Sequence, residues 1–367
     1  MKIIIDARLY KETGVGRYIR SLIKYLSCLD TENEYSLLLL PNDYLTYRPL
    51  NSKWKIIPTP AKWHSFKEQI IIPQLLRSEK PDLVHFPYFN VPIFYKGKFI
   101  VTIHDLTILN FATGKASTHC QLYYGIKLLG FKRALNHAVY DSIKIITVSN
   151  GVKNEIINKF KINPEKISVI YESGELEKDN SNSGIKLPPN YILYVGNAHP
   201  HKNIITLIDA FKIISAKDSK IKLLLIGKDD FFYKRIKEHI QNSNMAEKII
   251  VSGPVNNSQL ASYYKNARAF VFPSLSEGFG IPGLEAMSFG CPVIASDIKT
   301  FREIYSDAAL FFNPNNKKDI AEKITYLLNN KKIAENLINS GYQRTKLFSW
   351  KKMAIETLDV YNNAYKL

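Results

Sequence analysis

The chain has 367 residues, of which 46% are hydrophobic, and a net charge of +17 at pH 7. This length exceeds what one ordinary hydrophobic core needs and the composition excludes a disordered chain, so two α/β domains are expected. The basic excess is spread over both halves of the sequence. It fits an anionic ligand, an anionic membrane face or nucleic acid, and charge alone does not choose among them.

Cysteine usage and hydropathy indicate the compartment. Cys28, Cys120 and Cys291 show no metal-ligand spacing and cannot all pair, which favours a reducing environment. The first residues resemble a strand rather than a signal peptide, and no uncharged apolar run approaches the ~20 residues of a membrane span. We therefore expect a cytoplasmic protein, and a peripheral location on the inner face of the plasma membrane stays open.

The first half alternates apolar strands with helical patterns, which predicts a parallel sheet covered by helices on both faces. The expected strands are residues 2–6, 35–40, 82–86, 99–104 and 143–149, and the expected helices are 15–28 and 150–160.

A polar segment at residues 171–190 interrupts this pattern, is rich in Gly, Ser and Asn, and predicts a linker. The alternation then restarts and continues to a terminal helix that begins near Ser349, a plausible N-cap. The expected strands are 191–196, 221–227, 248–251, 267–272 and 291–296, with helices after His201 and at 231–242, 256–267 and 282–290. This predicts two Rossmann-like, doubly wound α/β domains at 1–180 and 181–347, followed by a helix at 348–367 that crosses back.

The most informative stretch is residues 273–290, PSLSEGFGIPGLEAMSFG. Pro282 suits the first turn of a helix and Gly290 suits a left-handed cap at its end. Glu277 lies on the glycine-rich turn, and Glu285 is expected in the first helical turn. Free N–H groups at a helix start suit a phosphate, and two nearby carboxylates suit ribose and sugar hydroxyls. The pattern suggests a nucleotide sugar, although an acid early in a helix is also favourable without any ligand.

Other unusual residues also follow predicted strands. Ligands of open parallel sheets bind outside the carboxyl ends of the strands, so we expect these residues to line one cleft between the domains. They are Gly14, Gly16, His104, Asp105, Ser149, Gly196, Lys202, Gly227, Gly253 and Glu277.

Two of these motifs have competing interpretations. Gly14-Val-Gly16 is not a dinucleotide fingerprint, because Ile19 stands where the third glycine belongs; it is either a phosphate- or acceptor-approach loop or an ordinary helix start. His104 either hydrogen-bonds a sugar hydroxyl and stabilises charge, or is a satisfied structural histidine followed by a capping Asp105.

Lys202 follows a strand at a predicted helix start, where its ammonium suits the two phosphates of a leaving nucleotide. No metal site is predicted, because His199 and His201 lack a third ligand at a useful spacing and the chain has no Asp-x-Asp pair. The basic amphipathic segment at 117–138 either packs on its own sheet or lies on an anionic membrane. The aromatic stretch 86–95 is either an acceptor loop or a packed one.

With these residues assembled, the chain resembles family 4 of the retaining glycosyltransferases, whose fold of two Rossmann-like domains facing each other across a cleft is called GT-B. The resemblance rests on GVGRY (14–18), TIHDL (102–106), TVS (147–149), YVGNAHPHKN (194–203), SGPV (252–255), the stretch 273–296 and FSW (348–350). The spacing of Glu277 and Glu285 is its most specific feature.

This resemblance implies roles for individual residues. Glu285 would hold the nucleotide ribose, and Glu277 with the backbone after Phe279 would contact the transferred sugar and the phosphates. Lys202 would stabilise the departing diphosphate, and His104 would lie by the donor sugar. The resemblance also implies donor-binding roles for Gly14, Gly16, Gly196, Gly227, Val255, Gly280 and Ile281, and acceptor-side roles for Arg17, Asp105 and Ser149.

The implied function is transfer of a hexose, mannose as a guess, from a GDP- or UDP-linked sugar to a glycan or lipid-linked glycan, without a cofactor or metal. Many relatives carry an arginine just ahead of the lysine, where this chain has His201, so a second permanent cation is in doubt. A nucleotide-sugar epimerase of the same fold and, more remotely, a nucleic-acid binder remain alternatives, although no nucleic-acid module is recognised.

Overall fold

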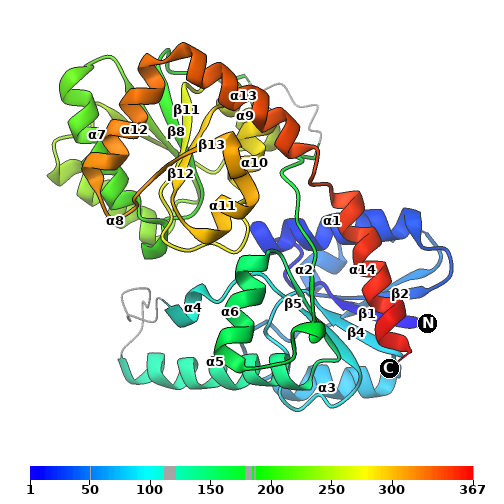
Figure 1. Cartoon of the computed structure of the whole chain (residues 1–367). Helices are drawn as coiled ribbons and strands as arrows, with labels where there is room; N and C mark the ends of the chain where they lie inside the picture. The colour runs from blue at the N-terminus through cyan, green and yellow to red at the C-terminus, as the bar shows by residue number, and fades with distance from the viewer. Residues whose placement is uncertain (50, 111–120, 178–183, 186, 367) are drawn as a thin grey trace. The chain divides into compact units, whose positions relative to one another are not determined.

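The computed structural model describes residues 1–49, 51–110, 121–177, 184–185 and 187–366. Two compact units are present (Figure 1). The first contains Met1–Leu106, the segment from helix α5 to Glu172, and Trp350–Leu367, and the second contains Ser173–Ser349 with the short helix α4 (Thr107–Asn110). Apart from the stretch that carries α4, the chain passes from the first unit to the second after Glu172 and returns at Trp350. The expected boundaries were after residues 180 and 347.

The first unit is built on a seven-stranded parallel sheet in the order β3-β2-β1-β4-β5-β6-β7. Its strands are β1 (Lys2–Asp6), β2 (Glu34–Leu39), β3 (Trp54–Pro58), β4 (Leu83–Phe86), β5 (Phe99–Ile103), β6 (Lys144–Thr147) and β7 (Ile167–Val169). Its helices are α1 (Gly14–Leu29), α2 (Pro41–Tyr44), α3 (Glu68–Glu79), α5 (Gln121–Asp141), α6 (Asn150–Phe160) and α14 (Trp350–Tyr365), with a 3₁₀ turn η1 (Pro164–Lys166).

The second unit is built on a six-stranded parallel sheet in the order β10-β9-β8-β11-β12-β13. Its strands are β8 (Tyr191–Val195), β9 (Lys222–Ile226), β10 (Ile249–Gly253), β11 (Ala269–Phe272), β12 (Val293–Ser296) and β13 (Ala309–Phe312). Its helices besides α4 are α7 (Ile204–Lys217), α8 (Phe231–Asn242), α9 (Asn257–Asn266), α10 (Ile281–Ser288), α11 (Lys299–Tyr305), α12 (Lys317–Asn329) and α13 (Lys331–Thr345), with 3₁₀ turns η2 (Pro200–Lys202) and η3 (Ser306–Ala308).

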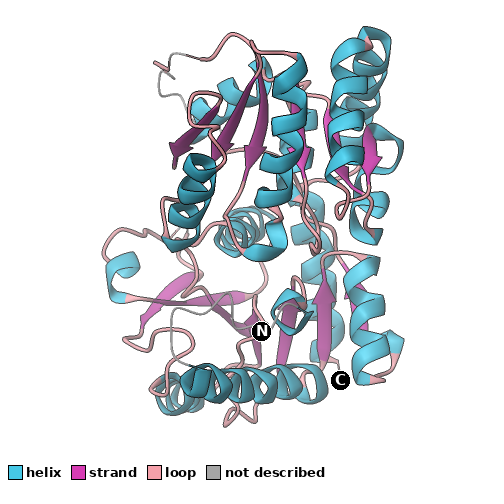
Figure 2. Ribbon diagram, turned by 90° about the vertical axis from the view of Figure 1, so that its left-hand side faces the viewer, coloured by secondary structure: helices cyan, strands magenta, loops and turns pink. Residues whose placement is uncertain are grey.

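The strands are apolar because both faces of each sheet are covered. Every residue of β4, β5 and β11 is buried, and helices flank each sheet (Figure 2). Parallel sheets packed in this way give continuous Val, Ile and Leu runs instead of alternation, which is why the strands were visible in the sequence. The prediction of two doubly wound domains is confirmed.

Strand order also fixes where a ligand can bind. In the first sheet β1 lies between β2 and β4, and in the second sheet β8 lies between β9 and β11. The connections leave in opposite directions from these central strands, and ligands of open parallel sheets bind at the carboxyl ends of the strands at such points. The polar residues singled out in the sequence follow these strands and their neighbours.

Several elements begin or end one or two residues from the expected positions, and β3, β7, β13, α2, α3, α4 and α11 to α13 were not expected. The predicted linker at 171–190 and the predicted basic helix at 117–138 fall partly outside the described residues. Within the described part, α5 spans Gln121–Asp141, and its residues Lys132 and Arg133 are exposed.

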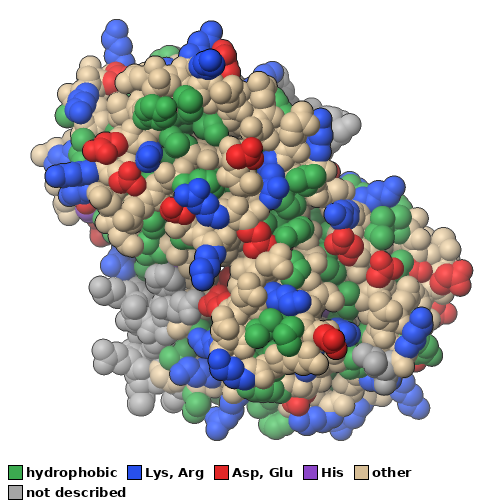
Figure 3. All heavy atoms as spheres, in the orientation of Figure 1, with side chains coloured by type: hydrophobic (Ala, Val, Ile, Leu, Met, Phe, Trp, Pro, Cys, Tyr) green, Lys and Arg blue, Asp and Glu red, His purple; other side chains and the backbone are tan. Residues whose placement is uncertain are grey.

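Helix α14 packs against α1 in the first unit, and the Tyr361 hydroxyl lies 2.7 Å from Nδ1 of His85 on β4. Among the residues that the structure describes, no helix has the length and apolarity needed to cross a membrane. Lys and Arg side chains are interspersed with Asp and Glu over both units on the face drawn in Figure 3, so the basic excess is not confined to one patch there.

Candidate active site

The turn before α10 depends on a glycine with positive φ. Gly280, the N-cap of α10, has φ 107°, and the Tyr305 hydroxyl donates to its carbonyl oxygen over 2.6 Å. A Cβ on Gly280 would lie 2.3 Å from that hydroxyl, so no other residue fits without a shift. As predicted, Pro282 lies in the first turn of α10, and Gly290 follows the helix with φ 71°.

A close ion pair lies beside this turn. The Lys202 ammonium is 2.6 Å from Oε1 of Glu277, with side chains 14% and 13% exposed. The Thr300 hydroxyl donates to the Glu277 carbonyl oxygen over 2.9 Å, and the ammonium lies 5.7 Å from the centre of the Phe272 ring. The pair is thus anchored on both sides and still reachable from solvent.

The segment that carries Lys202 is fixed to the Glu277 loop by backbone contacts. Lys202 closes the turn η2, and Asn203 follows in the left-handed conformation with φ 59°. Its side-chain amide donates to the carbonyl oxygens of Pro273 and Pro314, while the Leu275 amide donates to His201. The ammonium therefore keeps a defined position relative to Glu277, two residues ahead of the start of α7.

Glu285 does not lie in the first turn of α10, contrary to the prediction. The helix begins at Ile281, so Glu285 is its fifth residue, one turn into the helix. Its side chain is 2% exposed, and its Oε2 accepts a 2.8 Å hydrogen bond from the Tyr264 hydroxyl. A favourable helix dipole therefore does not explain this carboxylate, and burial of an acid is costly unless it is used or paired.

Glycines bring backbone together at the ends of β8 and β9. A Cβ on Gly227 would lie 2.2 Å from the Gly196 carbonyl oxygen, which accepts a hydrogen bond from the Tyr233 hydroxyl. Val255 is half-buried just after β10. These positions form one edge of the second sheet, next to the loop that carries Lys202.

Two further predicted donor residues are buried. The Phe279 ring packs edge-on against Phe348, with ring centres 5.5 Å apart, and Ile281 is the first residue of α10. Their side chains are buried, so only their backbone atoms can contact a ligand. Gly174 also contacts this helix, since a Cβ there would lie 2.5 Å from Leu284.

His104 ends β5 in the first unit with both ring nitrogens occupied. Nδ1 lies 3.0 Å from Oε1 of Glu172, and Nε2 lies 2.9 Å from the Pro87 carbonyl oxygen. Burial works against the charged imidazole, but the hydrogen bond and charge of Glu172 outweigh it and raise the pKa of His104. The expected hydrogen bond from His104 to a sugar hydroxyl would require one of these contacts to break.

The remaining first-unit candidates differ in their surroundings. A Cβ on Gly16 would lie 2.8 Å from two carbonyl oxygens of the preceding loop, whereas a Cβ on Gly14 would meet nothing within 4 Å. Arg17 and Asp105 are half-buried. Ser149 is buried and caps α6, because its hydroxyl accepts from the Val152 amide over 3.2 Å.

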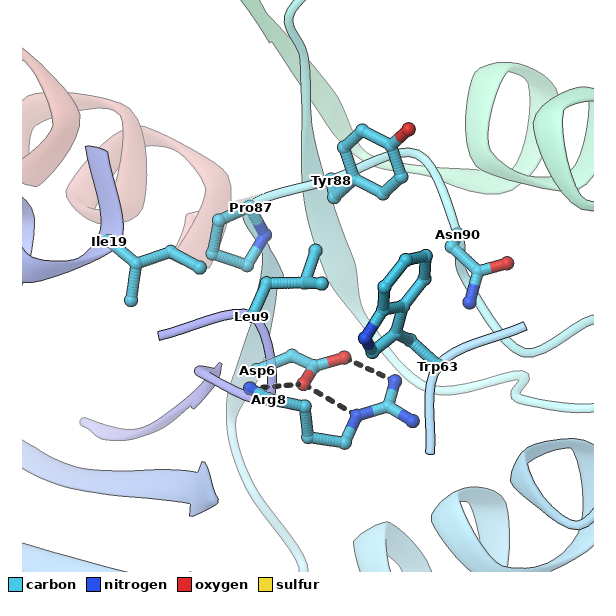
Figure 4. Close-up of a pocket in the computed structure, with 8 residues that line it drawn as sticks. All are labelled: Asp6, Arg8, Leu9, Ile19, Trp63, Pro87, Tyr88 and Asn90. Carbon is cyan, nitrogen blue, oxygen red and sulfur yellow. Dashed lines mark hydrogen bonds and ion pairs between the residues drawn. The ribbon is translucent and has the colours of Figure 1, made fainter. Parts of the chain in front are cut away.

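A buried charge cluster lies at the ends of β1 and β4. The Arg8 guanidinium contacts Asp6 at 2.6 Å and Glu68 at 2.9 Å, and Asn90 donates to Glu68 over 2.6 Å. The pocket beside it, partly walled by Trp63, has a volume of about 10 Å³ (Figure 4). This holds about one water molecule and is far too small for a sugar ring.

The described part of the chain contains no cluster of metal-ligating side chains. The rings of His199 and His201 stack with centres 5.9 Å apart, and no group of three His, Cys, Asp or Glu side chains there could hold a metal ion. The second-unit residues named above lie on one edge of their own sheet, and the predicted cleft between domains stays a prediction.

Sequence reasoning missed the residues that hold the candidates in place. Glu172, Tyr264, Thr300 and Tyr305 each contact a predicted site residue. Glu172 had a detectable signal: an Ile-rich run at 167–170 precedes it, and recognising that run as β7 would have placed Glu172 at the same sheet edge as His104. The other three gave no local signal, because their partners lie 20 or more residues away in sequence.

Comparisons with known proteins agree with this geometry. A family model described as "Glycosyltransferase Family 4" matches residues 13–173, and one described as "Glycosyl transferases group 1" matches residues 176–344. The chain is 30% identical over 264 residues to O-antigen chain mannosyltransferase RfbU of Salmonella typhimurium, covering 71% of this chain and 68% of the relative. It is 30% identical over 377 aligned positions to an uncharacterized glycosyltransferase, MJ1178, of Methanocaldococcus jannaschii, covering 98% of each.

Among solved structures, the fold matches Anabaena Alr3699/HepE in complex with UDP and glucose, with a TM-score of 0.76 and 15% sequence identity over 99% of this chain and 100% of that one. Identity at this level shows a shared fold.

Proposed function

The chain belongs to the family of glycosyl transferases group 1, and from this premise we propose that it moves a hexose, specifically mannose, from a nucleoside diphosphate sugar to a hydroxyl group with retention of configuration. The proposed acceptor is a glycan or lipid-linked glycan of polysaccharide biosynthesis. The observation that carries the proposal is the Lys202–Glu277 pair beside the Gly280 turn, in a chain 30% identical to a protein named as an O-antigen chain mannosyltransferase.

The proposed chemistry needs positive charge at the leaving group. Transfer passes through an oxocarbenium-like transition state while negative charge grows on the departing diphosphate. The Lys202 ammonium and the positive end of the α10 dipole oppose that charge, and such contacts are strongest away from bulk water. Glu277 orients the ammonium through their 2.6 Å contact. The leaving phosphate itself takes the acceptor's proton, because it departs on the face that the acceptor attacks.

We propose that no resident cofactor or metal takes part, because Lys202 supplies the positive charge that a divalent ion would otherwise bring to the diphosphate. Turnover that is unchanged after exhaustive EDTA treatment supports this, and turnover restored only by added Mg²⁺ or Mn²⁺ contradicts it.

The first experiment identifies the donor. A thermal-shift screen compares GDP, UDP, ADP and dTDP, since a ligand at 100 times its Kd stabilises the folded state by about 2.7 kcal/mol. We expect GDP to give the largest shift, in keeping with a mannose donor. Equal shifts for all four, or none, would remove the support for a specific nucleotide site.

Incubation with the sugar nucleotide alone separates transfer from epimerisation. An epimerase converts the sugar of the donor without an acceptor, whereas a transferase leaves it intact or slowly hydrolyses it. Product analysis by NMR also reports the anomeric configuration, and an inverted product would contradict the proposed retention.

We further propose that the first unit docks on an anionic membrane surface. Phe66, Ile70 and Phe94 are 88%, 59% and 59% exposed. Phe66 and Ile70 are one turn apart at the start of α3, and the Ile93 amide donates to Gln69 over 2.8 Å, which holds the Phe94 loop against this turn. Exposed lysines at positions 62, 67, 96 and 98 lie within four residues of Phe66 or Phe94 in the sequence. Exposed apolar side chains accompanied by lysines suit the headgroup region of anionic lipid.

Vesicle co-flotation tests this surface. The wild type should bind vesicles containing phosphatidylglycerol and not vesicles of phosphatidylcholine alone, and binding should weaken as salt is raised. Changing Phe66 and Phe94 to Ser should abolish binding, whereas changing the exposed Tyr326 and Tyr342 of the second unit to Ser should not. Equal binding of both variants would contradict the assignment.

A further inference from the structure

The protonation state of His104 follows from what its two nitrogens contact. A backbone carbonyl oxygen and an ionised carboxylate only accept hydrogen bonds. The Pro87 carbonyl oxygen lies 2.9 Å from Nε2, and the Glu172 carboxylate lies 3.0 Å from Nδ1. When Glu172 is ionised, both ring nitrogens donate, which requires a proton on each. The geometry describes an imidazolium–carboxylate pair.

The neighbouring strand carries a histidine that is neutral instead of charged. His85 on β4 is fully buried, and its nitrogens face two hydroxyls, Tyr361 at 2.7 Å and Thr102 at 2.9 Å. A hydroxyl can donate or accept, so one proton suffices for this ring. Burial and the nearby His104 charge lower the pKa of His85 to about 3, and it is neutral. A charged ring is thus not a general property of this strand edge.

The groups around His104 favour its charge on balance. Glu172 comes after β7, and Asp105, next in the chain, adds a second negative charge. The Tyr18 ring from α1 packs edge-on at 5.0 Å, with its hydroxyl bonded to Thr102 over 3.1 Å. Neutral His85 also acts on this ring electrostatically. No cation among these neighbours opposes the imidazolium.

We propose that Glu172 is a positioning residue that keeps His104 as an imidazolium at neutral pH, so that His104 contributes a fixed positive charge to catalysis instead of a hydrogen bond. The charge state stands on the contacts within the first unit, and only its effect on turnover rests on the proposed function. The proton is held by Glu172 and is not transferred in the reaction.

The charge state is measured directly by NMR. Full-length protein labelled with ¹⁵N at histidine is titrated from about pH 5.5 to 9, and the His104→Gln variant identifies the His104 signals. We expect both ring nitrogens of His104 to carry protons at pH 7.5. In Glu172→Gln the amide oxygen still accepts from Nδ1 but the charge is gone, so the titration midpoint should fall by about one to three units.

Glu165→Gln is the matched control, because it removes an exposed carboxylate from the same unit. Its His104 midpoint should equal that of the wild type. A wild-type ring with a single proton at pH 7.5, or a midpoint that Glu172→Gln leaves in place, would overturn the charge assignment whether or not any transferase activity is found.

The catalytic consequence is tested by the pH profile of kcat. Wild-type kcat should decline as pH rises through the His104 midpoint, and in Glu172→Gln that decline should move to lower pH by the same interval, with the donor KM at pH 6 little changed. Glu172→Asp, which keeps a carboxylate, should restore part of the difference. A decline that stays in place while the NMR midpoint moves would show that the charge is not used in turnover.

Discussion

The two sheet edges organise their polar residues in different ways. In the first unit, Arg8 lies between Asp6 and Glu68, and His104 pairs with Glu172, all buried or nearly so. In the second unit, Lys202 and Glu277 form a pair that solvent reaches, beside the Gly280 turn with its positive φ. The Arg8 cluster, with side chains 0–10% exposed, is enclosed by its own partners, whereas the Lys202–Glu277 pair keeps 13–14% of its side-chain area exposed beside the Gly280 turn. Substitutions should therefore cost stability at the first edge and activity at the second.

The largest effect is expected at Arg8. Arg8→Met leaves the carboxylates of Asp6 and Glu68 buried without their cation, and breaking a buried pair in this way costs about 3–5 kcal/mol. Urea unfolding followed by fluorescence measures the loss. The control is Lys237→Met, which breaks an exposed pair with Asp229 and should change stability by at most about 1 kcal/mol. Equal losses in the two variants would remove the distinction between the two kinds of pair.

Lys202→Ala should show the opposite pattern. Losing one contact to the developing charge lowers kcat by about 10²-fold or more, while the unfolding midpoint changes little because the Lys202 side chain is reached by solvent. Steady-state kinetics with the donor found in the nucleotide screen measures this, and Lys237→Ala serves as the control. Near-normal turnover of Lys202→Ala would contradict the role assigned to the ammonium.

The two glycines at the start of α1 give a smaller contrast. In Gly16→Ala the new Cβ meets two backbone carbonyl oxygens at 2.8 Å, so the loop must shift, at a cost of about 1–3 kcal/mol. In Gly14→Ala the Cβ meets nothing within 4 Å, and stability should stay within about 0.5 kcal/mol of the wild type or rise slightly. Thermal unfolding of both variants compares their stability directly. A larger loss of stability for Gly14→Ala than for Gly16→Ala would contradict this prediction.

The pH dependence of the His104–Glu172 pair gives a further contrast between the two edges. The folded-state pKa of His104 is raised, so its contribution to stability is fully present below the unfolded value of about 6.5 and is lost as pH rises through the folded value. Glu172→Gln should therefore destabilise the protein more at pH 6 than at pH 9, by about 1.4 kcal/mol for each unit of pKa shift removed. Chemical unfolding at both pH values measures the difference, and a loss independent of pH would indicate packing alone.

The same contrast explains what could be predicted from the sequence. Strands such as 2–6 and 191–195 were recognisable because both faces of each sheet are covered, and the Gly280 turn because glycine and proline mark backbone conformations locally. The partners of the charged residues were not recognisable, since Arg8 and Glu68 are 60 residues apart and His104 and Glu172 are 68 apart. Glu285 was predicted in the first helical turn, but the helix begins at Ile281 and Glu285 is its fifth residue.

Nucleotide binding by calorimetry tests most directly the central claim that the carboxyl edge of the second sheet holds the donor. The full-length wild type, Lys202→Ala, Glu285→Gln and Glu165→Gln are titrated with the nucleoside diphosphate that gave the largest thermal shift. The account predicts at least about a tenfold rise in Kd for Lys202→Ala and Glu285→Gln, on the scale of 1.4 kcal/mol, and no change for Glu165→Gln. The same Kd for all four proteins would contradict it.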